Sequence, residues 1–148
     1  MTKQEKLKMV NTRCAFNMHN GIYVTDFGDD FCVVECELTP DTQNPLGMAH
    51  GGCVFSVCDV AAGALILLRG SNSVTLSANI QYLRPTKGKK MRCVGKIIKD
   101  GRSIIVLQTD VYNDDGELTA RGTIESYILG KAKGRRHGLS PAALRRCG

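Results

Sequence analysis

The stretch Gly52–Leu68 reads GCVFSVCDVAAGALILL, and it decides the fold of the chain. Apolar and small residues dominate this stretch, which predicts a helix of about four or five turns that is buried on most sides. Asp59 is the only ionisable carboxylate in it. Because a buried carboxylate is costly and usually serves a function, Asp59 is the first candidate for a catalytic group.

A stripe of small and polar residues runs along the predicted helix. Its members recur at spacings of four, three and four residues, which places them on one face: Gly52, Ser56, Asp59 and Gly63. The remaining faces carry Val, Leu and Ile side chains and predict the core contacts. We expect the stripe to admit a ligand or a second backbone, with Gly52 and Ser56 binding substrate beside Asp59.

Strand signals flank the predicted helix on both sides. The runs Ile22–Phe27 and Phe31–Leu38 are separated by Gly28-Asp29-Asp30, which is suitable hairpin chemistry. After the helix, apolar and polar residues alternate until Pro85 interrupts the pattern. This alternation predicts a strand with its apolar side chains on one face: Val74, Leu76, Ala78, Ile80 and Tyr82.

The remaining strands predict an antiparallel meander. Met91–Lys99 and Ser103–Tyr112 flank Asp100-Gly101, a two-residue hairpin signal, and a last strand falls near Glu117–Leu129. Two strands therefore precede the long apolar helix and four follow it. This order predicts an α+β domain in which an antiparallel sheet wraps around one long central helix.

The 148 residues suit one domain with a single core, since 43% are hydrophobic and 23% are charged. Residues 1–20 form an N-terminal helical segment, within which residues 3–18 predict one amphipathic helix. Its apolar face holds Leu7, Val10, Cys14 and Met18. The main domain spans residues 21–130. Residues 131–148 hold six Lys or Arg and no acidic residue, and we expect a flexible basic tail there.

Composition and patterning argue against several classes of function. The first ten residues hold no apolar run of signal-peptide length, and the longest apolar run, Val60–Leu68, is too short to span a membrane. We therefore expect a cytoplasmic protein with no membrane partner. The basic tail attracts phosphates or nucleic acid by simple electrostatics, but it has no aromatic residue for base stacking. Nucleic acid is not an expected partner.

The cysteines predict neither disulfides nor a metal site. They are odd in number, form no CxxC pair and are interpreted as reduced core residues: Cys14, Cys32, Cys36, Cys53, Cys58, Cys93 and Cys147. Three scattered histidines form no ligand cluster either. We expect no metal. A cysteine hydrolase that uses Cys53 or Cys58 with His50 is an alternative, since a thiolate near a helix start is activated.

A second group of candidate residues surrounds the start of the helix. The segment Asn44-Pro-Leu-Gly-Met-Ala-His50-Gly-Gly leads into it, Asp59 follows nine residues after His50, and the strand VTLSANIQYLRP and an Asp-Gly-Arg hairpin come later. In these features residues 20–129 resemble the hotdog-fold acyl-CoA thioesterases of the phenylacetate-pathway (PaaI-like) type. The resemblance implies hydrolysis of an acyl- or aryl-CoA to free acid and coenzyme A, with no cofactor besides the coenzyme A of the substrate.

The resemblance also implies roles for individual residues. Asp59 would act as general base or nucleophile, and Gly51 would present its backbone N–H to the thioester carbonyl oxygen. His50 would orient the turn, while Asn44 and Thr75 would position the thioester or the attacking water. The chemistry agrees, because free N–H groups at a helix start stabilise the negative charge that develops on that oxygen.

Most of these residues also have a purely structural interpretation. Gly51-Gly52 suits a tight helix start, and His50 suits a helix cap. Asn44, which precedes a proline, suits a turn. Asp59 lies too far along the helix to be its N-cap and would then be a hydrogen-bonding partner at an interface. Four basic residues near the end of the alternating strand are candidates for the coenzyme A phosphates or a solvated face: Arg84, Lys87, Lys89 and Lys90.

The resemblance further implies an assembly. Two protomers would join their sheets edge to edge as a homodimer and share two active sites at the interface, and such dimers would pair into a homotetramer. An alternative function is a non-catalytic acyl-CoA-binding module or sensor. The carboxylate of Asp59 favours catalysis over that alternative.

Overall fold

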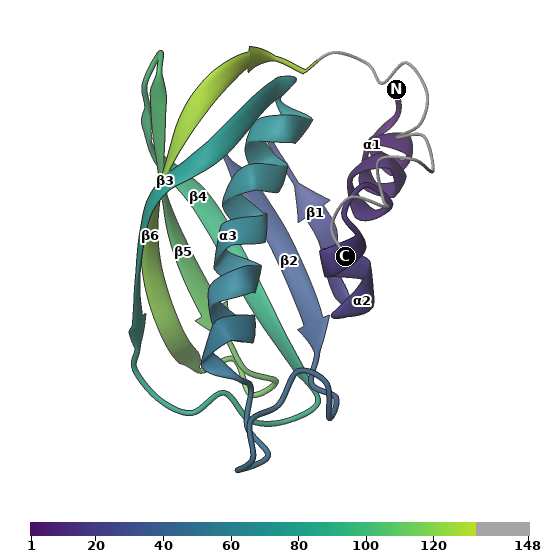
Figure 1. The fold of residues 1–148 in the computed structure, drawn as a ribbon, viewed down its shortest axis with the longest axis vertical. Helices are drawn as coiled ribbons and strands as arrows, with labels where there is room; N and C mark the ends of the chain where they lie inside the picture. Colours follow the sequence, from purple (N-terminus) through teal and green to yellow (C-terminus); the bar gives the residue numbers. More distant parts are fainter. Residues whose placement is uncertain (133–148) are drawn as a thin grey trace, which may run out of the picture.

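The computed structural model of the chain describes residues 1–132 and shows a six-stranded antiparallel sheet curved around a single long helix (Figure 1). The predicted basic tail lies outside the described residues from position 133 onward. The elements, in chain order, are α1 Lys3–Asn11, α2 Ala15–His19, β1 Ile22–Phe27, β2 Phe31–Glu37, α3 Gly51–Leu68, β3 Ser71–Tyr82, β4 Lys90–Asp100, β5 Ile104–Tyr112 and β6 Leu118–Lys131.

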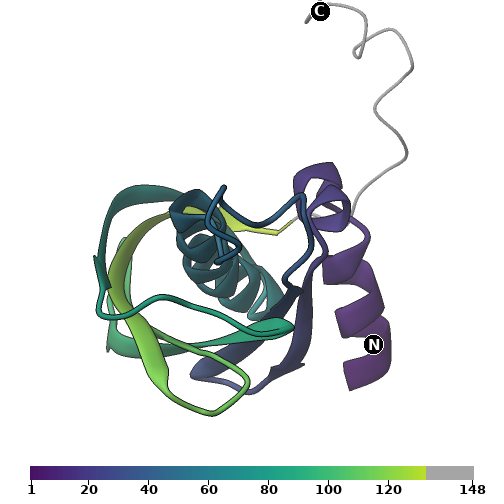
Figure 2. The ribbon, with the colours of Figure 1, turned by 90° about the horizontal axis from the view of Figure 1, so that it is seen from below.

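The sheet has the strand order β1-β2-β4-β5-β6-β3, so β3 crosses from the end of α3 to the far edge, beside β6. Helix α3 lies in the concave face of the sheet, while α1 and α2 lie outside it near β1 (Figure 2). This arrangement confirms the predicted antiparallel sheet around one central helix. The hairpin at Asp100-Gly101 is present, although Asp100 still belongs to β4 and residues 101–103 make the connection.

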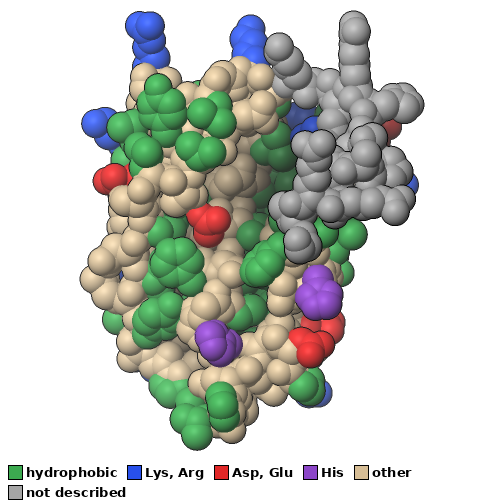
Figure 3. All heavy atoms as spheres, in the orientation of Figure 1, with side chains coloured by type: hydrophobic (Ala, Val, Ile, Leu, Met, Phe, Trp, Pro, Cys, Tyr) green, Lys and Arg blue, Asp and Glu red, His purple; other side chains and the backbone are tan. Residues whose placement is uncertain are grey.

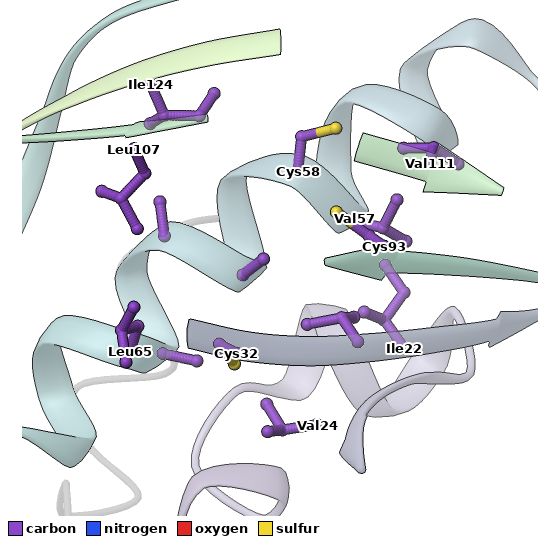
Figure 4. Packing of buried hydrophobic residues seen from close by; sticks show 14 of the residues in the cluster. Ile22, Val24, Cys32, Val57, Cys58, Leu65, Cys93, Leu107, Val111 and Ile124 are labelled. Atoms are coloured by element: carbon purple, nitrogen blue, oxygen red, sulfur yellow. The ribbon is translucent and has the colours of Figure 1, made fainter. Parts of the chain in front are cut away.

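The core lies between α3 and the inner face of the sheet. Val57 and Leu65 of α3 belong to one buried cluster with Leu107 and Ile124 of β5 and β6, which Figure 4 shows from close by. This packing accounts for the apolar composition of α3, which by length and composition alone also suits a membrane span. Burial on the sheet side stabilises the helix by the hydrophobic effect, at roughly 25 cal/mol per Å² of apolar surface.

Cysteines contribute to the core as small apolar side chains. Four of them are buried: Cys32, Cys36, Cys58 and Cys93. Burial raises the pKa of the Cys32 thiol to about 12, which keeps it neutral. Among residues 1–132 the six cysteines are free thiols, in agreement with the prediction of reduced residues. Cys147 lies outside the described part of the chain.

The N-terminal segment differs from the prediction of one helix over residues 3–18. Helix α1 ends at Asn11, and the next residue, Thr12, is its C-cap, with φ −106° and ψ 2° and its hydroxyl donating to the Lys8 carbonyl oxygen at 2.9 Å. Cys14 is extended, with φ −118° and ψ 110°, before the short α2 begins. Met18 consequently leaves the predicted apolar face and is 45% exposed.

Strand β3 differs from the prediction that its apolar residues share one face. The pairing with β6 shifts register between Thr75 and Ser77, so Leu76 is an extra residue in a β-bulge. Thr75 and Ala78 both face α3 as a result, which strict alternation does not allow. Val74 and Leu76 are 49% and 54% exposed. The prediction was wrong for the first half of the strand because alternation in sequence does not reveal a bulge.

The two edge strands of the sheet differ in whether another element covers them. At β1, the Asn11 side chain of α1 accepts a hydrogen bond from the Val24 N–H at 2.8 Å and donates one to the Val24 carbonyl oxygen at 2.9 Å, so α1 covers that edge. The outer edge of β3 pairs with no other strand in the described part of the chain. Its sequence, SNSVTLSANIQY, contains no charged residue and no proline. An uncharged, unpaired edge of twelve residues is ready to pair with another strand.

Candidate active site

The start of α3 leaves one backbone N–H free. His50 is the N-cap, with φ −62° and ψ 135°, and its Nδ1 accepts a hydrogen bond from the Gly52 N–H at 2.9 Å. Its carbonyl oxygen accepts from the N–H groups of Cys53 and Val54 at 2.8 and 3.0 Å. The Gly51 N–H bonds to no other group within residues 1–132. The helix therefore offers this donor, at the positive end of its dipole, to a ligand.

The loop before the helix holds the Asn44 side chain and leaves one of its donors free. Its Oδ1 accepts hydrogen bonds from the N–H groups of Leu46 and Met48, at 2.9 and 3.2 Å. Its Nδ2 makes no hydrogen bond to any described residue. Turn chemistry thus fixes the amide by its oxygen and leaves the nitrogen as a donor. Asn44 and Gly51 line one pocket of about 420 Å³.

Asp59 lies two turns further along α3, next to β3. The Thr75 hydroxyl donates a hydrogen bond to Asp59 Oδ1 at 2.6 Å. The carboxylate is only half-buried, although the surrounding sequence is largely apolar. The reason is that the sheet covers one side of α3 and leaves the stripe of small and polar residues outside the core. Asp59 Oδ2 has no hydrogen-bond partner within the described residues, so this oxygen is available for chemistry.

The two donors and the carboxylate do not converge within one chain. Gly51 and Asp59 are eight residues apart on one helix, and at 1.5 Å per residue this separates them by about 12 Å along the axis. A carbonyl group bound at Gly51 is therefore out of reach of Asp59 in the same chain. One protomer presents two half-sites: an amide half-site, Asn44 with Gly51, and an acidic half-site, Asp59 with Thr75.

The two stripe residues predicted to bind substrate also lie outside the core. Gly52 is exposed, and its N–H is held by the His50 cap. Ser56 is half-buried and donates its hydroxyl to the Gly52 carbonyl oxygen at 2.7 Å, which anchors it to its own helix. Figure 3 shows the face of the molecule on which α3 is not covered by the sheet. Apolar side chains gather on the part of this face along which β3 runs.

The four basic candidates for phosphate binding do not gather at one place. Arg84 lines the pocket that contains Asn44 and Gly51. Lys87 and Lys89 border a different hollow together with three acidic residues: Asp114, Asp115 and Glu117. Lys90 pairs with Glu35 of β2, with 2.9 Å between Nζ and Oε2. Arg84 alone of the four lies beside the amide half-site.

Sequence reasoning missed the role of Tyr82, which it treated as an apolar strand residue. The Tyr82 hydroxyl donates a hydrogen bond to the Gly51 carbonyl oxygen at 2.8 Å. Desolvation raises the pKa of this hydroxyl, so it remains a donor. The only signal was its place at the end of a strand, just before Pro85. The position of Tyr82 in the sequence does not reveal its contact with Gly51, which lies 31 positions earlier.

The cysteine-hydrolase alternative does not assemble in the structure. His50 Nδ1 is engaged by the Gly52 N–H, and Cys58 is buried in the core. Cys53 Sγ lies 3.8 Å from Cys36 Sγ, on the side of α3 that faces β2. Among residues 1–132 no hydrogen bond joins a cysteine thiol to the His50 imidazole.

Comparison with known proteins places this geometry in a family. The sequence profile of the thioesterase superfamily matches residues 46–120, which include the whole of α3 and β3. A Haemophilus influenzae protein, provisionally described as an esterase, is 30% identical over 117 residues, covering 76% of this chain and 85% of that protein. The medium/long-chain acyl-CoA thioesterase YigI of Escherichia coli is 22% identical and covers 88% and 97% of the two chains.

Solved structures agree with this fold. The PaaI protein from the phenylacetic acid degradation operon of E. coli superimposes with a TM-score of 0.80 at 21% identity, covering 87% of this chain and 94% of that one. A hypothetical thioesterase from Streptococcus pneumoniae, solved with coenzyme A, gives a TM-score of 0.71 at 26% identity, with 76% and 91% coverage. These similarities confirm the hotdog fold and the resemblance seen in the sequence.

Proposed function

The chain belongs to the thioesterase superfamily, and from that premise we propose that it hydrolyses acyl- or aryl-CoA thioesters to a free acid and coenzyme A. The observation that carries the proposal is the pair formed by Asp59 and Thr75 on the side of α3 that its own sheet leaves open. A carboxylate held by one donor, with its second oxygen free, suits the activation of water.

The reaction divides between the two half-sites. The thioester carbonyl oxygen accepts hydrogen bonds from the Gly51 N–H and Asn44 Nδ2, which stabilise the negative charge that develops as the carbonyl carbon is attacked. Asp59 acts as general base and takes a proton from the attacking water, or attacks as nucleophile itself, in which case water hydrolyses the acyl–Asp59 anhydride to the free acid after coenzyme A has left. Thr75 fixes the carboxylate. The C–S bond then breaks, and coenzyme A leaves as the thiolate. No metal or further cofactor enters these steps.

Structures of the Streptococcus pneumoniae thioesterase support the choice of Asp59 and Thr75. That protein has also been solved as two variants, in which an aspartate and a threonine sixteen residues apart are each replaced by alanine. Asp59 and Thr75 have the same separation in this chain. The shared spacing supports a pair in which the helix supplies the acid and the following strand supplies the hydroxyl.

The separation of the half-sites supports a homodimer with shared active sites. The uncharged outer edge of β3 is suited to pair with the same edge of a second copy, whereas α1 covers the opposite edge at β1. Such pairing brings two copies of α3 together along their open stripes. The amide half-site of one protomer then faces the acidic half-site of its partner. We propose this homodimer as the active unit, with a homotetramer as its larger assembly.

Thiol release from a panel of acyl-CoAs tests the proposed function. Short, medium, long and aromatic acyl groups are compared, with free coenzyme A detected by a thiol reagent. We expect turnover of at least one class without added metal. Tight binding of acyl-CoA with no turnover by the wild type would contradict hydrolysis and favour a binding module.

Mixing two inactive variants tests whether the site is shared. Asp59→Asn removes the carboxylate, and Gly51→Pro removes the backbone N–H. After exchange of subunits in an equimolar mixture, half of the dimers are mixed, and each mixed dimer has one intact site. We therefore expect recovery of about a quarter of wild-type activity. If activity depends on residues of one chain only, the mixture stays inactive.

A further inference from the structure

One peptide group at the start of α3 is held at both ends by side chains. It is the peptide that joins Gly51 to Gly52. Its N–H donates to His50 Nδ1 at 2.9 Å, and its carbonyl oxygen accepts from the Tyr82 hydroxyl at 2.8 Å. Tyr82 comes from the end of β3, so this hydrogen bond also ties the start of the helix to the sheet.

We propose that Tyr82 is a positioning residue that keeps the Gly51 N–H directed at the thioester carbonyl oxygen. The inference rests on the proposed function and adds to it a group that acts through Gly51 rather than on the substrate. Tyr82 lines the same pocket as Asn44 and Gly51. Its ring also packs against Gly51, since a Cβ placed there would meet Tyr82 Oη at 3.6 Å and Cε1 at 3.7 Å.

The reason for such a restraint lies in the two consecutive glycines. Glycine has the largest conformational freedom of any residue, and helix ends fray. A fraying first turn would let the peptide of Gly51 rotate and turn the free N–H away from the pocket. The His50 carbonyl oxygen is fixed by the N–H groups of Cys53 and Val54. With the next peptide fixed by Tyr82 and His50, both peptide planes around Gly51 are set before substrate binds.

A preorganised donor matters most in the transition state, because it meets the developing charge without reorganisation. Loss of the Tyr82 hydroxyl should therefore lower kcat more than it raises KM. A purely structural role would instead lower thermal stability and leave the kinetics of the folded fraction unchanged. These two outcomes separate a positioning residue from a packing residue.

The variant Tyr82→Phe keeps the ring and removes the hydrogen bond. We expect kcat to fall by about tenfold and KM to change by less than about twofold. The matched control is Tyr23→Phe, on the opposite edge strand β1, where the hydroxyl makes no hydrogen bond to a described residue and lies outside the pocket. Tyr23→Phe should behave as wild type. An unchanged kcat in Tyr82→Phe would overturn the proposal.

Amide hydrogen exchange supplies a readout that does not need substrate. In ¹⁵N-labelled protein, Tyr82→Phe should speed exchange at Gly52 and Cys53 by about tenfold relative to wild type, because the first turn opens more often. Tyr23→Phe should leave these rates unchanged. Unchanged exchange in Tyr82→Phe would contradict the restraint. If exchange responds but the wild type hydrolyses no thioester, the proposed function fails while the restraint at the helix start stands.

Discussion

Replacing Asp59 by asparagine should leave a folded protein that has lost most of its hydrolytic activity. Asparagine has nearly the same shape and still accepts the Thr75 hydroxyl through its amide oxygen. It can neither take a proton from water nor attack a thioester as a carboxylate does. Since general-base catalysis contributes about 10²–10⁴-fold, we expect a loss of kcat in that range with an unchanged circular dichroism spectrum.

The control for this variant is Asp30→Asn, in the turn between β1 and β2. Asp30 is exposed, and its carboxylate makes no hydrogen bond or ion pair with another described residue. This change removes the same charge at a distance from the site and should leave kcat unchanged. Wild-type hydrolysis by Asp59→Asn would exclude Asp59 from the chemistry.

The variant Gly51→Pro should inactivate the enzyme by deleting a single N–H. Proline is well accepted at the first position of a helix, where no hydrogen bond within the helix is lost. His50, which would precede the proline, already has the extended conformation that this position requires, with ψ 135°. The fold should therefore persist. Loss of one oxyanion donor typically costs about 10²–10³-fold in kcat, and we expect that loss here.

The variant Gly51→Ala tests whether the site needs the Gly51 N–H or the absence of a side chain at this position. Alanine keeps the donor, and its Cβ would meet Tyr82 at an ordinary van der Waals distance of 3.6 Å. Its kcat should fall far less than that of Gly51→Pro. Equal losses in both variants would show that the site requires the absence of a side chain. Full activity in Gly51→Pro would remove Gly51 from the oxyanion site.

Much of the fold could be predicted because its signals are local. The apolar stretch that forms α3 and the turn residues around Asp100-Gly101 depend on neighbours in sequence, and the observed bounds of α3 and β5 lie within one residue of those predicted. The N-terminal helix was predicted to be too long, because periodicity does not show where a helix ends. The periodicity of Leu7, Val10 and Cys14 suits a helix, but it does not register the cap that Thr12 forms.

The candidate site was only partly visible in the sequence, because its parts come from distant positions. The N-cap His50, Gly51 and Asp59 belong to one helix, so their positions along it could be predicted from their spacing. The contact between Thr75 and Asp59 depends on a bulge, and that between Tyr82 and Gly51 depends on how β3 crosses the molecule. Charge alone also grouped Arg84 with three lysines that the structure places elsewhere.

The bulge at Leu76 makes β3 tolerant of a change in length at one position. If Leu76 were deleted, Thr75 and Ser77 would pair with the consecutive residues Ser126 and Glu125, and every other side chain of the strand would keep its face. A deletion elsewhere in β3 would turn one part of the strand over and carry Thr75 or Tyr82 away from α3. Sequences of different length can therefore present the same hydroxyl to the same carboxylate, provided that the gap in their alignment falls at this residue.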